Sequence, residues 1–229
     1  MKKLSVTLRP SEKILGFIYL AIEILLLQSC IWMVNLFLGE PMSEAQLNFL
    51  YFFVNFLFTT LIFHRLLINC GKIALAAPLR CLSAAFTGFI LNWAANIAVS
   101  MVITGFFPDF YNVNDDSISG LVQNNYVLMS IGTVLLAPVA EELLFRGLVF
   151  GSLYNRNRWL AYTVSVVGFA CLHVIGYIGL YPPVHLLLCL VQYIPAALIL
   201  CWVYARSNTI WAPILMHIAV NAIAILSMR

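Results

Sequence analysis

The stretch Tyr126–Tyr154, YVLMSIGTVLLAPVAEELLFRGLVFGSLY, is apolar along most of its length and yet contains three charged residues. A predominantly apolar run of about 20 residues is long enough to cross the hydrocarbon core of a bilayer as a helix. An ionised side chain at mid-bilayer costs about 2.5–3.5 kcal/mol even on the lenient insertion scale. Because Glu141, Glu142 and Arg146 stand close together in one such run, the stretch predicts a membrane helix that carries a functional site.

The composition of the whole chain is that of a membrane protein. Hydrophobic residues make up 63% of the 229 positions and charged residues only 9%, against about 45–50% and about 25% in an ordinary soluble domain. So few charges cannot cover a soluble globule, and the lipid bilayer must therefore solvate most of the outside. The net charge of +3 comes without a basic patch interleaved with aromatic residues, so we expect no nucleic-acid partner.

The apolar residues form runs that are each near the length needed to cross a bilayer. The seven predicted runs are Ile14–Leu38, Leu47–Ile68, Leu82–Phe106, Tyr126–Tyr154, Trp159–Leu180, Val184–Ala205 and Thr209–Met228. The fourth run is long, but we treat it as one crossing. The sequence therefore predicts an all-α fold, a polytopic membrane bundle of about seven transmembrane helices.

Outside the runs or near their ends, lysine and arginine residues occupy alternate connections, with Arg229 at the C-terminal end as the exception. They occur in the N-terminal segment and in the second, fourth and sixth connections, as Lys2, Lys3, Arg9, Lys13, Arg65, Lys72, Arg80, Arg156, Arg158 and Arg206. By the positive-inside rule these connections are cytoplasmic. We expect a multi-pass protein of the cell membrane with a cytoplasmic N-terminus, an outside C-terminus and one sizeable outer loop, Pro108–Asn125.

Helical periodicity separates the two neighbouring carboxylates of the fourth run. Glu142 and Arg146 are four residues apart, so they share a face and can form an ion pair. Glu141 points about 100° away and is left for another partner. We therefore expect one structural carboxylate and one that is available for chemistry.

Two later runs bring further polar groups to a similar depth. His173 lies in the fifth run, and His217 and Asn221 share a face of the seventh. Counted at about 1.5 Å per residue from the inner ends of the runs, the depths are roughly 20 Å for Glu141, 21 Å for His173, 12 Å for His217 and 18 Å for Asn221. These groups can meet in one site. The remaining intramembrane polar residues are interpreted as interhelical hydrogen-bonding groups: Glu23, Asn92, Asn96 and Gln192.

These residue types are the parts of a hydrolase. A buried carboxylate beside a histidine can activate water as a general base, and a second histidine with an asparagine can donate to a developing oxyanion. The sequence has no HExxH, no GxSxG and no aspartate inside a run, which argues against three other protease designs. A proton- or ion-coupled transporter and a non-proteolytic immunity or regulatory protein remain alternatives.

The polar motifs, taken in chain order, resemble one family. Glu141-Glu142-xxx-Arg146, Phe169-xxx-His173 and His217-xxx-Asn221, the last preceded by Trp211-Ala-Pro-Ile, are similar to motifs of the CPBP family. That family contains the type II CAAX prenyl endopeptidases and the Abi-type, bacteriocin-processing membrane proteases. The resemblance covers about Tyr126–Ala224 and implies a helical bundle with a cavity open toward the cytoplasm. On this basis we expect residues 126–229 to form the catalytic core, and residues 1–125 to supply three further helices and the outer loop.

The resemblance also implies roles for the polar residues. Glu141 would activate water with His173 and cleave a peptide or protein substrate in or at the membrane. The residues implied to stabilise the oxyanion or to hold the site in shape are, respectively, His217 with Asn221, and Glu142 with Arg146. In a cell without protein prenylation, a leader peptide or a membrane-anchored peptide would be the substrate.

The same ligand set allows two mechanisms. Zn²⁺ could bind to Glu141, His173 and His217 with one position open, or these groups could act without a metal. We expect no cofactor, because Asn221 is a poor zinc ligand and a good oxyanion donor. We also expect the two histidine rings to lie too far apart for joint coordination.

Overall fold

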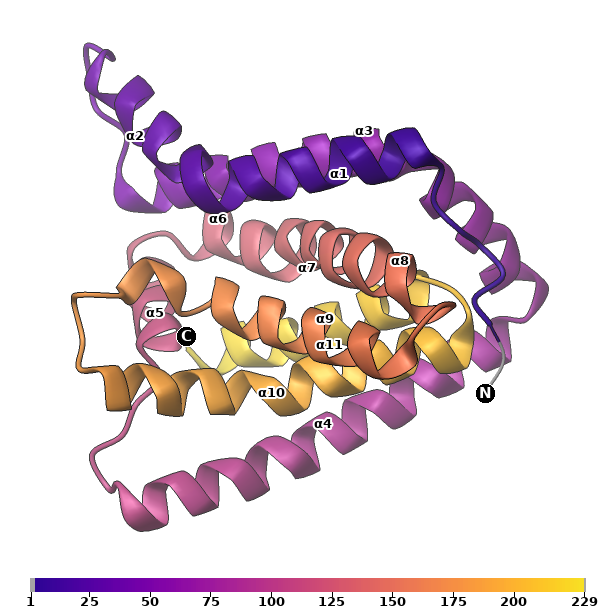
Figure 1. The fold of residues 1–229 in the computed structure, drawn as a ribbon. Helices are drawn as coiled ribbons and strands as arrows, with labels where there is room; N and C mark the ends of the chain where they lie inside the picture. The colour runs from indigo at the N-terminus through magenta and orange to yellow at the C-terminus, as the bar shows by residue number, and fades with distance from the viewer. Residues whose placement is uncertain (1–2, 229) are drawn as a thin grey trace.

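All seven apolar runs contain helices in the computed structural model, which describes residues 3–228 (Figure 1). The elements are α1 (Pro10–Ile22), η1 (Glu23–Leu27), α2 (Gln28–Leu36), α3 (Glu44–Ala76), α4 (Pro78–Phe106), α5 (Val113–Asn124), α6 (Tyr126–Ser130), η2 (Ile131–Leu136), α7 (Ala137–Glu141), η3 (Glu142–Phe150), α8 (Gly151–Tyr154), α9 (Arg158–Leu172), η4 (Ile175–Tyr177), α10 (Pro183–Ser207) and α11 (Trp211–Ser227). The first three η elements are π-helical and η4 is a 3₁₀ turn. No strand longer than a single bridge occurs in the described part of the chain, so the all-α class is confirmed.

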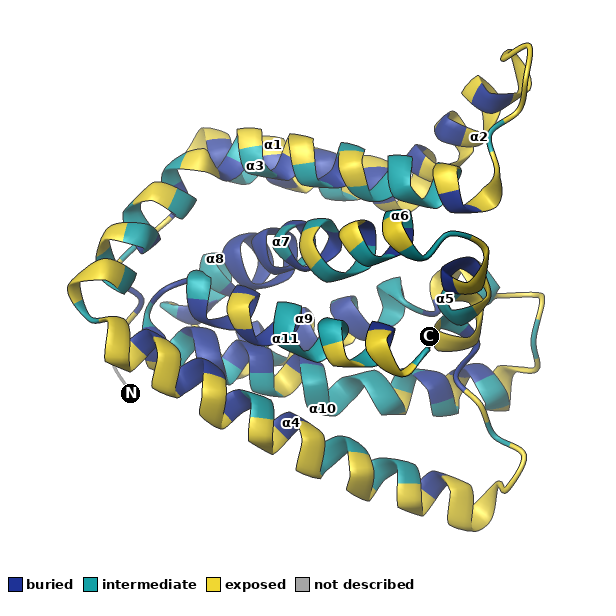
Figure 2. Ribbon diagram, turned by 180° about the vertical axis from the view of Figure 1, so that it is seen from behind, coloured by how far each residue is buried: buried dark blue, intermediate teal, exposed yellow. Residues whose placement is uncertain are grey.

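Five helical stretches are long and apolar enough to cross a membrane: Pro10–Leu36, Glu44–Ala76, Pro78–Phe106, Tyr126–Tyr154 and Pro183–Ser207. Two shorter apolar helices, α9 and α11, complete the predicted runs. The outward faces of the bundle are exposed in Figure 2 and carry large apolar side chains such as Leu75, Phe86 and Phe106. Because lipid can cover a surface of this kind and water cannot do so without cost, the polytopic membrane bundle is confirmed.

The fourth run forms one helical path through the middle of the bundle, as predicted. It passes through α6, η2, α7, η3 and α8, and every residue of η3 is buried (Figure 2). Pro138 lacks a backbone N–H, and the wider π-helical turns of η2 directly precede its helix. Helix α3 packs against η2 and α7, while α9 packs against η3. The run that carries the charged residues is therefore enclosed by helices from both halves of the chain.

The fifth run is shorter than predicted. The sequence analysis extended it to Leu180, but α9 ends at Leu172 and is followed by η4 and a loop. Gly179 adopts a positive φ of 85°, a conformation that favours glycine, and two prolines follow that cannot donate a helical hydrogen bond. As a result, His173 lies at the carboxyl end of α9 instead of inside a span.

The predicted outer loop contains a helix that the sequence analysis did not expect, α5. Asn112 caps it, because its side-chain Oδ1 accepts hydrogen bonds from the backbone N–H groups of Asn114 and Asp115. Helix α5 packs against α3 and α6 at the end of the bundle away from the N-terminus (Figure 1). Helix α4 packs along α10, across the predicted boundary between residues 125 and 126, and the division into two parts stays a prediction.

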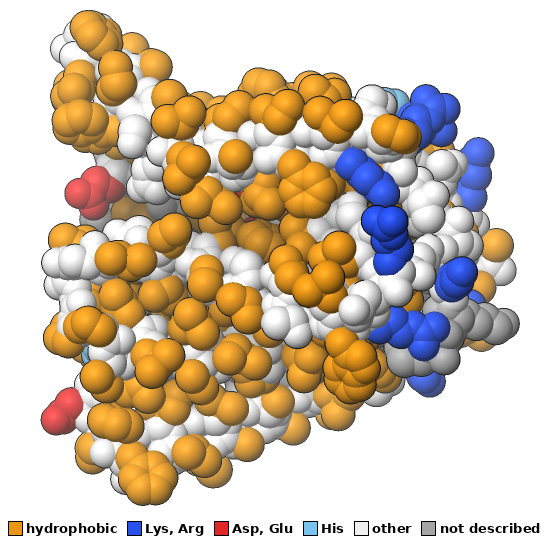
Figure 3. Space-filling model, viewed as in Figure 1, with side chains coloured by type: hydrophobic (Ala, Val, Ile, Leu, Met, Phe, Trp, Pro, Cys, Tyr) orange, Lys and Arg blue, Asp and Glu red, His pale blue; other side chains and the backbone are white. Residues whose placement is uncertain are grey.

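The charged side chains are segregated along the bundle. Figure 3 shows Lys and Arg gathered at the end where Figure 1 places the N-terminus, and acidic side chains at the opposite end. This segregation follows from the alternation of basic connections, although Lys2 lies outside the described residues. The end that faces the cytoplasm stays a prediction.

Candidate functional site

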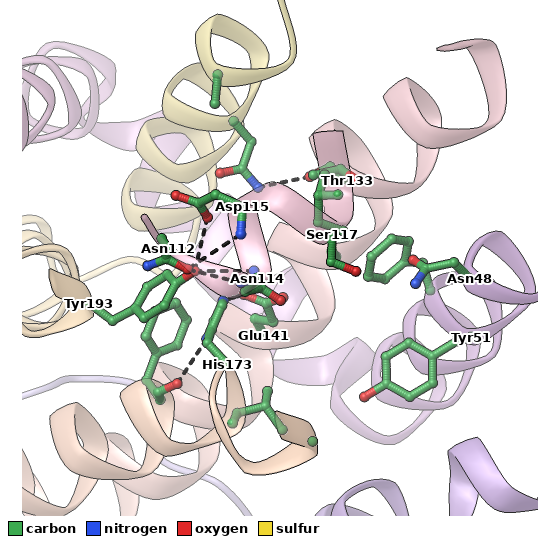
Figure 4. Close-up of a pocket in the computed structure, with 18 of the residues that line it drawn as sticks. Asn48, Tyr51, Asn112, Asn114, Asp115, Ser117, Thr133, Glu141, His173 and Tyr193 are labelled. Atoms are coloured by element: carbon green, nitrogen blue, oxygen red, sulfur yellow. Dashed lines mark hydrogen bonds and ion pairs between the residues drawn. The ribbon is translucent and has the colours of Figure 1, made fainter. Parts of the chain in front are cut away.

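A cavity of about 1070 Å³ lies inside the bundle. Its walls come from η1, α2, α3, α4, α5, α7, α9, α10 and α11, and Figure 4 shows polar side chains facing it from several of these elements. Four of the predicted site residues line it, namely Glu141, His173, His217 and Asn221. The other two, Glu142 and Arg146, are fully buried behind this wall.

The cavity reaches the end of the bundle opposite the basic residues. Its lining includes Glu44, Asp115 and Met228, which belong to segments that Figure 1 places away from the N-terminus, and Figure 3 shows a hollow there. At the basic end, the N-terminal segment is fastened across the bundle because Leu4 exchanges backbone hydrogen bonds with the side chain of Asn155. The expected opening at the cytoplasmic end and the expected cytoplasmic location of the basic residues therefore cannot both be right.

Glu142 and Arg146 form the ion pair that their spacing predicts. Arg146 Nη1 donates to Glu142 Oε1 at 2.9 Å, and both side chains are 0% exposed. The guanidinium also donates to the carbonyl oxygen of Ala197 at 3.1 Å and lies 4.2 Å from the centroid of the Phe169 ring. Arg146 thus ties η3 to α9 and α10. A guanidinium suits this position because it is planar and can donate hydrogen bonds while it stacks on an aromatic ring.

Glu142 has a second partner that the sequence analysis did not assign. His217 Nδ1 lies 2.9 Å from the same Oε1 atom. A carboxylate is only an acceptor, so this nitrogen carries the proton and donates it. Glu142 therefore fixes both the Arg146 guanidinium and the orientation of the His217 ring.

Glu141 faces the cavity and both histidines. Its Oε2 atom lies 4.0 Å from His173 Nε2 and 3.8 Å from His217 Nε2, and within the described residues it has no hydrogen-bond partner. His173 Nδ1 lies 2.9 Å from the carbonyl oxygen of Phe169, to which it must donate. Because Nδ1 is the hydrogen-bonded nitrogen in both rings, the two Nε2 atoms are the ones presented to Glu141.

Asn221 lines the cavity but does not form a pair with His217. Its side-chain Nδ2 donates to the carbonyl oxygen of Thr133 at 2.8 Å. An amide nitrogen has two hydrogens, so one is used to fix the side chain and the other is available to a ligand. The i,i+4 spacing correctly placed both residues on the cavity face of α11. It could not show that they bond to different elements, His217 to Glu142 and Asn221 to Thr133.

Sequence reasoning missed the contact of Tyr193, on α10, with His173, and the hydrogen bonds that join Tyr193 to the start of α5. The Tyr193 ring lies 4.3 Å from the His173 ring, centroid to centroid, and its hydroxyl lies 3.1 Å from Asn112 Oδ1 and 3.0 Å from Asp115 Oδ1. Asp115 is exposed to the cavity, yet the surrounding protein displaces enough water to raise its pKa, against the opposing effects of the Tyr193 hydroxyl and His173. In the sequence, the only indication of these contacts was the presence of acidic residues in the predicted outer loop.

The four residues interpreted as interhelical groups all line the cavity. Gln192 does bond between elements, because its Oε1 accepts from Asn112 Nδ2 at 2.8 Å and its Nε2 donates to Ser100 Oγ at 3.4 Å. Glu23 accepts a hydrogen bond from the Tyr51 hydroxyl at 3.5 Å. Gln192 and Glu23 thus connect helices, as predicted, whereas Asn92 Oδ1 has no hydrogen-bond partner among the described residues. The interhelical role of Asn96 stays a prediction, and all four side chains make the cavity polar.

The groups around Glu141 can be compared with a zinc site. Two nitrogens and one carboxylate oxygen are suitable donors for Zn²⁺. Ligands about 2.1 Å from a tetrahedral ion lie about 3.4 Å from one another, whereas the two His-to-Glu141 separations are 3.8 and 4.0 Å. No group of three or more His, Cys, Asp and Glu side chains with metal-binding geometry occurs between residues 3 and 228. The donor types fit zinc, and the spacing is wider than a bound ion requires.

Comparison with known proteins finds similarity over the part of the chain that carries this site. Residues 123–223 match the family described as "Type II CAAX prenyl endopeptidase Rce1-like". The chain is 30% identical over 139 residues to the "Putative membrane peptidase YdiL" of Bacillus subtilis (strain 168), covering 60% of this chain and 52% of that protein. It is 32% identical over 87 residues to the "UPF0177 protein YxdF" of Lactococcus lactis subsp. lactis (strain IL1403), covering 38% of this chain and 42% of that protein.

The matches cover part of this chain and part of each relative. The chain spans about half the length of the curated relatives it matches, and no solved structure matches it significantly. The family match includes all six predicted site residues, since they lie between positions 141 and 221. The resemblance to the type II CAAX prenyl endopeptidases, predicted from the motifs, is therefore confirmed over residues 123–223.

Proposed function

We propose that this protein is an intramembrane endopeptidase that hydrolyses a peptide bond in a membrane-associated or leader-bearing peptide. One observation carries the proposal: Glu141 Oε2 and the Nε2 atoms of His173 and His217 converge within 4.0 Å inside a cavity large enough for a peptide segment. The family match to a group of endopeptidases supports the reaction class.

Glu141 acts as the general base in the proposed reaction. It takes a proton from a water molecule that it shares with His173, while the water oxygen attacks the peptide carbonyl carbon. The C–N bond then breaks as the same proton passes from Glu141 to the leaving nitrogen. The separation of 4.0 Å between Glu141 Oε2 and His173 Nε2 leaves both groups able to contact one water molecule.

His217 and Asn221 stabilise the oxyanion in this proposal. In the imidazolium form of His217, Nδ1 donates to Glu142 and the Nε2–H group can donate to the oxyanion. The second amide hydrogen of Asn221 is the other donor. With His217 protonated, the charges of Arg146 and His217 balance those of Glu141 and Glu142, which lowers the cost of burying four ionisable groups together.

A metal-free reaction is part of the proposal. If Zn²⁺ were bound, Glu141, His173 and His217 would hold it, and it would supply Lewis-acid activation of water. The 3.8 and 4.0 Å separations favour a bridging water over direct coordination by all three groups.

The test is cleavage of a quenched-fluorescent peptide library by purified protein in detergent. Glu141→Gln keeps the shape of the side chain and removes the base, so we expect turnover to fall by about 10²–10⁴-fold. Glu40→Gln is the matched control, because Glu40 is exposed and lies outside the cavity lining. Peptide binding without any Glu141-dependent turnover would instead identify a non-proteolytic regulatory or immunity protein.

A further inference from the structure

Glu23 is a buried carboxylate on the wall of the cavity. It begins η1 in the first span and is 5% exposed. Oε1 accepts a single hydrogen bond, from the Tyr51 hydroxyl at 3.5 Å, and Oε2 has no hydrogen-bond partner among the described residues. In Figure 4, Tyr51 lies across the cavity from Tyr193 and His173. The wall that contains Glu23 therefore faces the proposed catalytic residues.

No cation of the described chain compensates Glu23. The cavity lining contains the carboxylates of Glu23, Glu44, Asp115 and Glu141, and it contains no Lys or Arg. Glu142, which is 0% exposed, is by contrast bonded to Arg146 and His217. Glu23 thus has no Lys or Arg partner among the residues that line the cavity.

An incompletely bonded carboxylate in such a position is costly. Burying an ionised group without a partner is strongly unfavourable, and a cation that forms a charge-assisted hydrogen bond removes most of that cost. The rest of the lining is rich in amides, including Asn48, Asn92 and Gln192, which suit the polar backbone of an extended peptide. A purely apolar ligand would leave Glu23 Oε2 and the Oδ1 atoms of Asn48 and Asn92 without a hydrogen-bond partner.

We infer that Glu23 is a specificity-determining residue that binds a cationic group of the substrate, an ammonium or a guanidinium, while the peptide bond to be cleaved lies against Glu141. This inference rests on the proposed endopeptidase function and adds a substrate class to it. The substrate is a peptide with a Lys or Arg side chain, or a free N-terminal amine, displaced from the cleaved bond across the cavity.

The experiment uses N-acetylated, quenched-fluorescent decapeptides that carry Lys, norleucine or Glu at each position in turn. For at least one position, we expect the full-length wild type in detergent to show a kcat/KM about tenfold or more higher for Lys than for norleucine, as expected for a charge-assisted hydrogen bond. Glu23→Gln should reduce this ratio to about one, and Glu23→Lys should favour the Glu peptide. Glu40→Gln, which changes an exposed carboxylate outside the cavity, should keep the wild-type ratio.

A binding measurement separates this inference from the proposed reaction. Fluorescence anisotropy with labelled Lys and norleucine peptides compares Glu141→Gln with the Glu23→Gln/Glu141→Gln double variant. Selective binding of Lys that depends on Glu23 supports the inference even if no peptide is cleaved. Peptides with a free N-terminus show whether the terminal amine can replace Lys. Equal binding of all peptides, or a Lys preference that survives Glu23→Gln, would overturn it.

Discussion

Replacing Arg146 with alanine should destabilise the whole bundle. The guanidinium is the only basic side chain that contacts Glu142 apart from the His217 ring, within the part of the chain that the structure describes. In Arg146→Ala, Glu142 remains buried at 0% exposure and loses its permanent cation. The variant also loses the hydrogen bond to Ala197 and the contact with the Phe169 ring.

The size of the effect follows from these contacts. Breaking a buried ion pair by removing one partner costs about 3–5 kcal/mol, because the other charge is left uncompensated. In a protein of this length, about 1 kcal/mol corresponds to roughly 2–4 °C in the melting temperature. We therefore expect the melting temperature to fall by about 6–20 °C.

The assay is thermal unfolding in detergent followed by tryptophan fluorescence. Lys72→Ala is the control, because Lys72 is exposed and such changes are usually within about 0.5 kcal/mol. The double variant Glu142→Leu/Arg146→Met should recover much of the loss, since an apolar pair leaves no buried charge. A melting temperature of Arg146→Ala equal to that of wild type would refute the assignment of the pair as the support of the site.

Three further predictions concern the metal dependence, the orientation in the membrane and the positioning of His173. Activity of the purified protein should survive a strong zinc chelator; stoichiometric zinc, with activity lost on chelation and restored by the ion, would make His217 a ligand. Reporter fusions should place Lys72 and Arg156 in the cytoplasm and Asp115 outside, and the reverse pattern would contradict the predicted orientation. Tyr193→Phe keeps the ring on His173 and loses the bonds to α5, so kcat should fall less than in Tyr193→Ala. Equal kcat values would show that the ring does not position His173.

The sequence was sufficient to predict the helical bundle and the identity of the polar groups, for a clear physical reason. Membrane helices can be predicted from the length and apolarity of a single run. Charged residues inside such a run are costly, so they indicate a functional or structural role. The i,i+4 spacing of Glu142 and Arg146 also determined their ion pair, because a helix fixes that geometry locally. Each of these features depends on one segment of chain only.

Features that depend on two segments could not be predicted in the same way. Nothing in the sequence near His217 indicates that its Nδ1 would bond Glu142, 75 residues away. The helix α5 was missed because its sequence is polar and short, and its contribution to the cavity depends on how it packs against α3 and α6. Glu23 was correctly identified as a group that bonds between helices, but its incomplete bonding becomes visible only when the cavity is formed.

The direction from which a substrate would enter depends on two features, the end of the bundle at which the cavity opens and the orientation of the bundle in the membrane. The N-terminal segment crosses the basic end and is tied to Asn155 and Asn208, while the cavity lining continues to Asp115 and Met228 at the other end. If the positive-inside rule holds, a peptide reaches Glu141 from outside or from within the bilayer. If Asp115 is cytoplasmic, the opening implied by the family resemblance is correct, and this protein is an exception to the charge rule. The reporter at Asp115 therefore determines in which compartment the substrate must be sought.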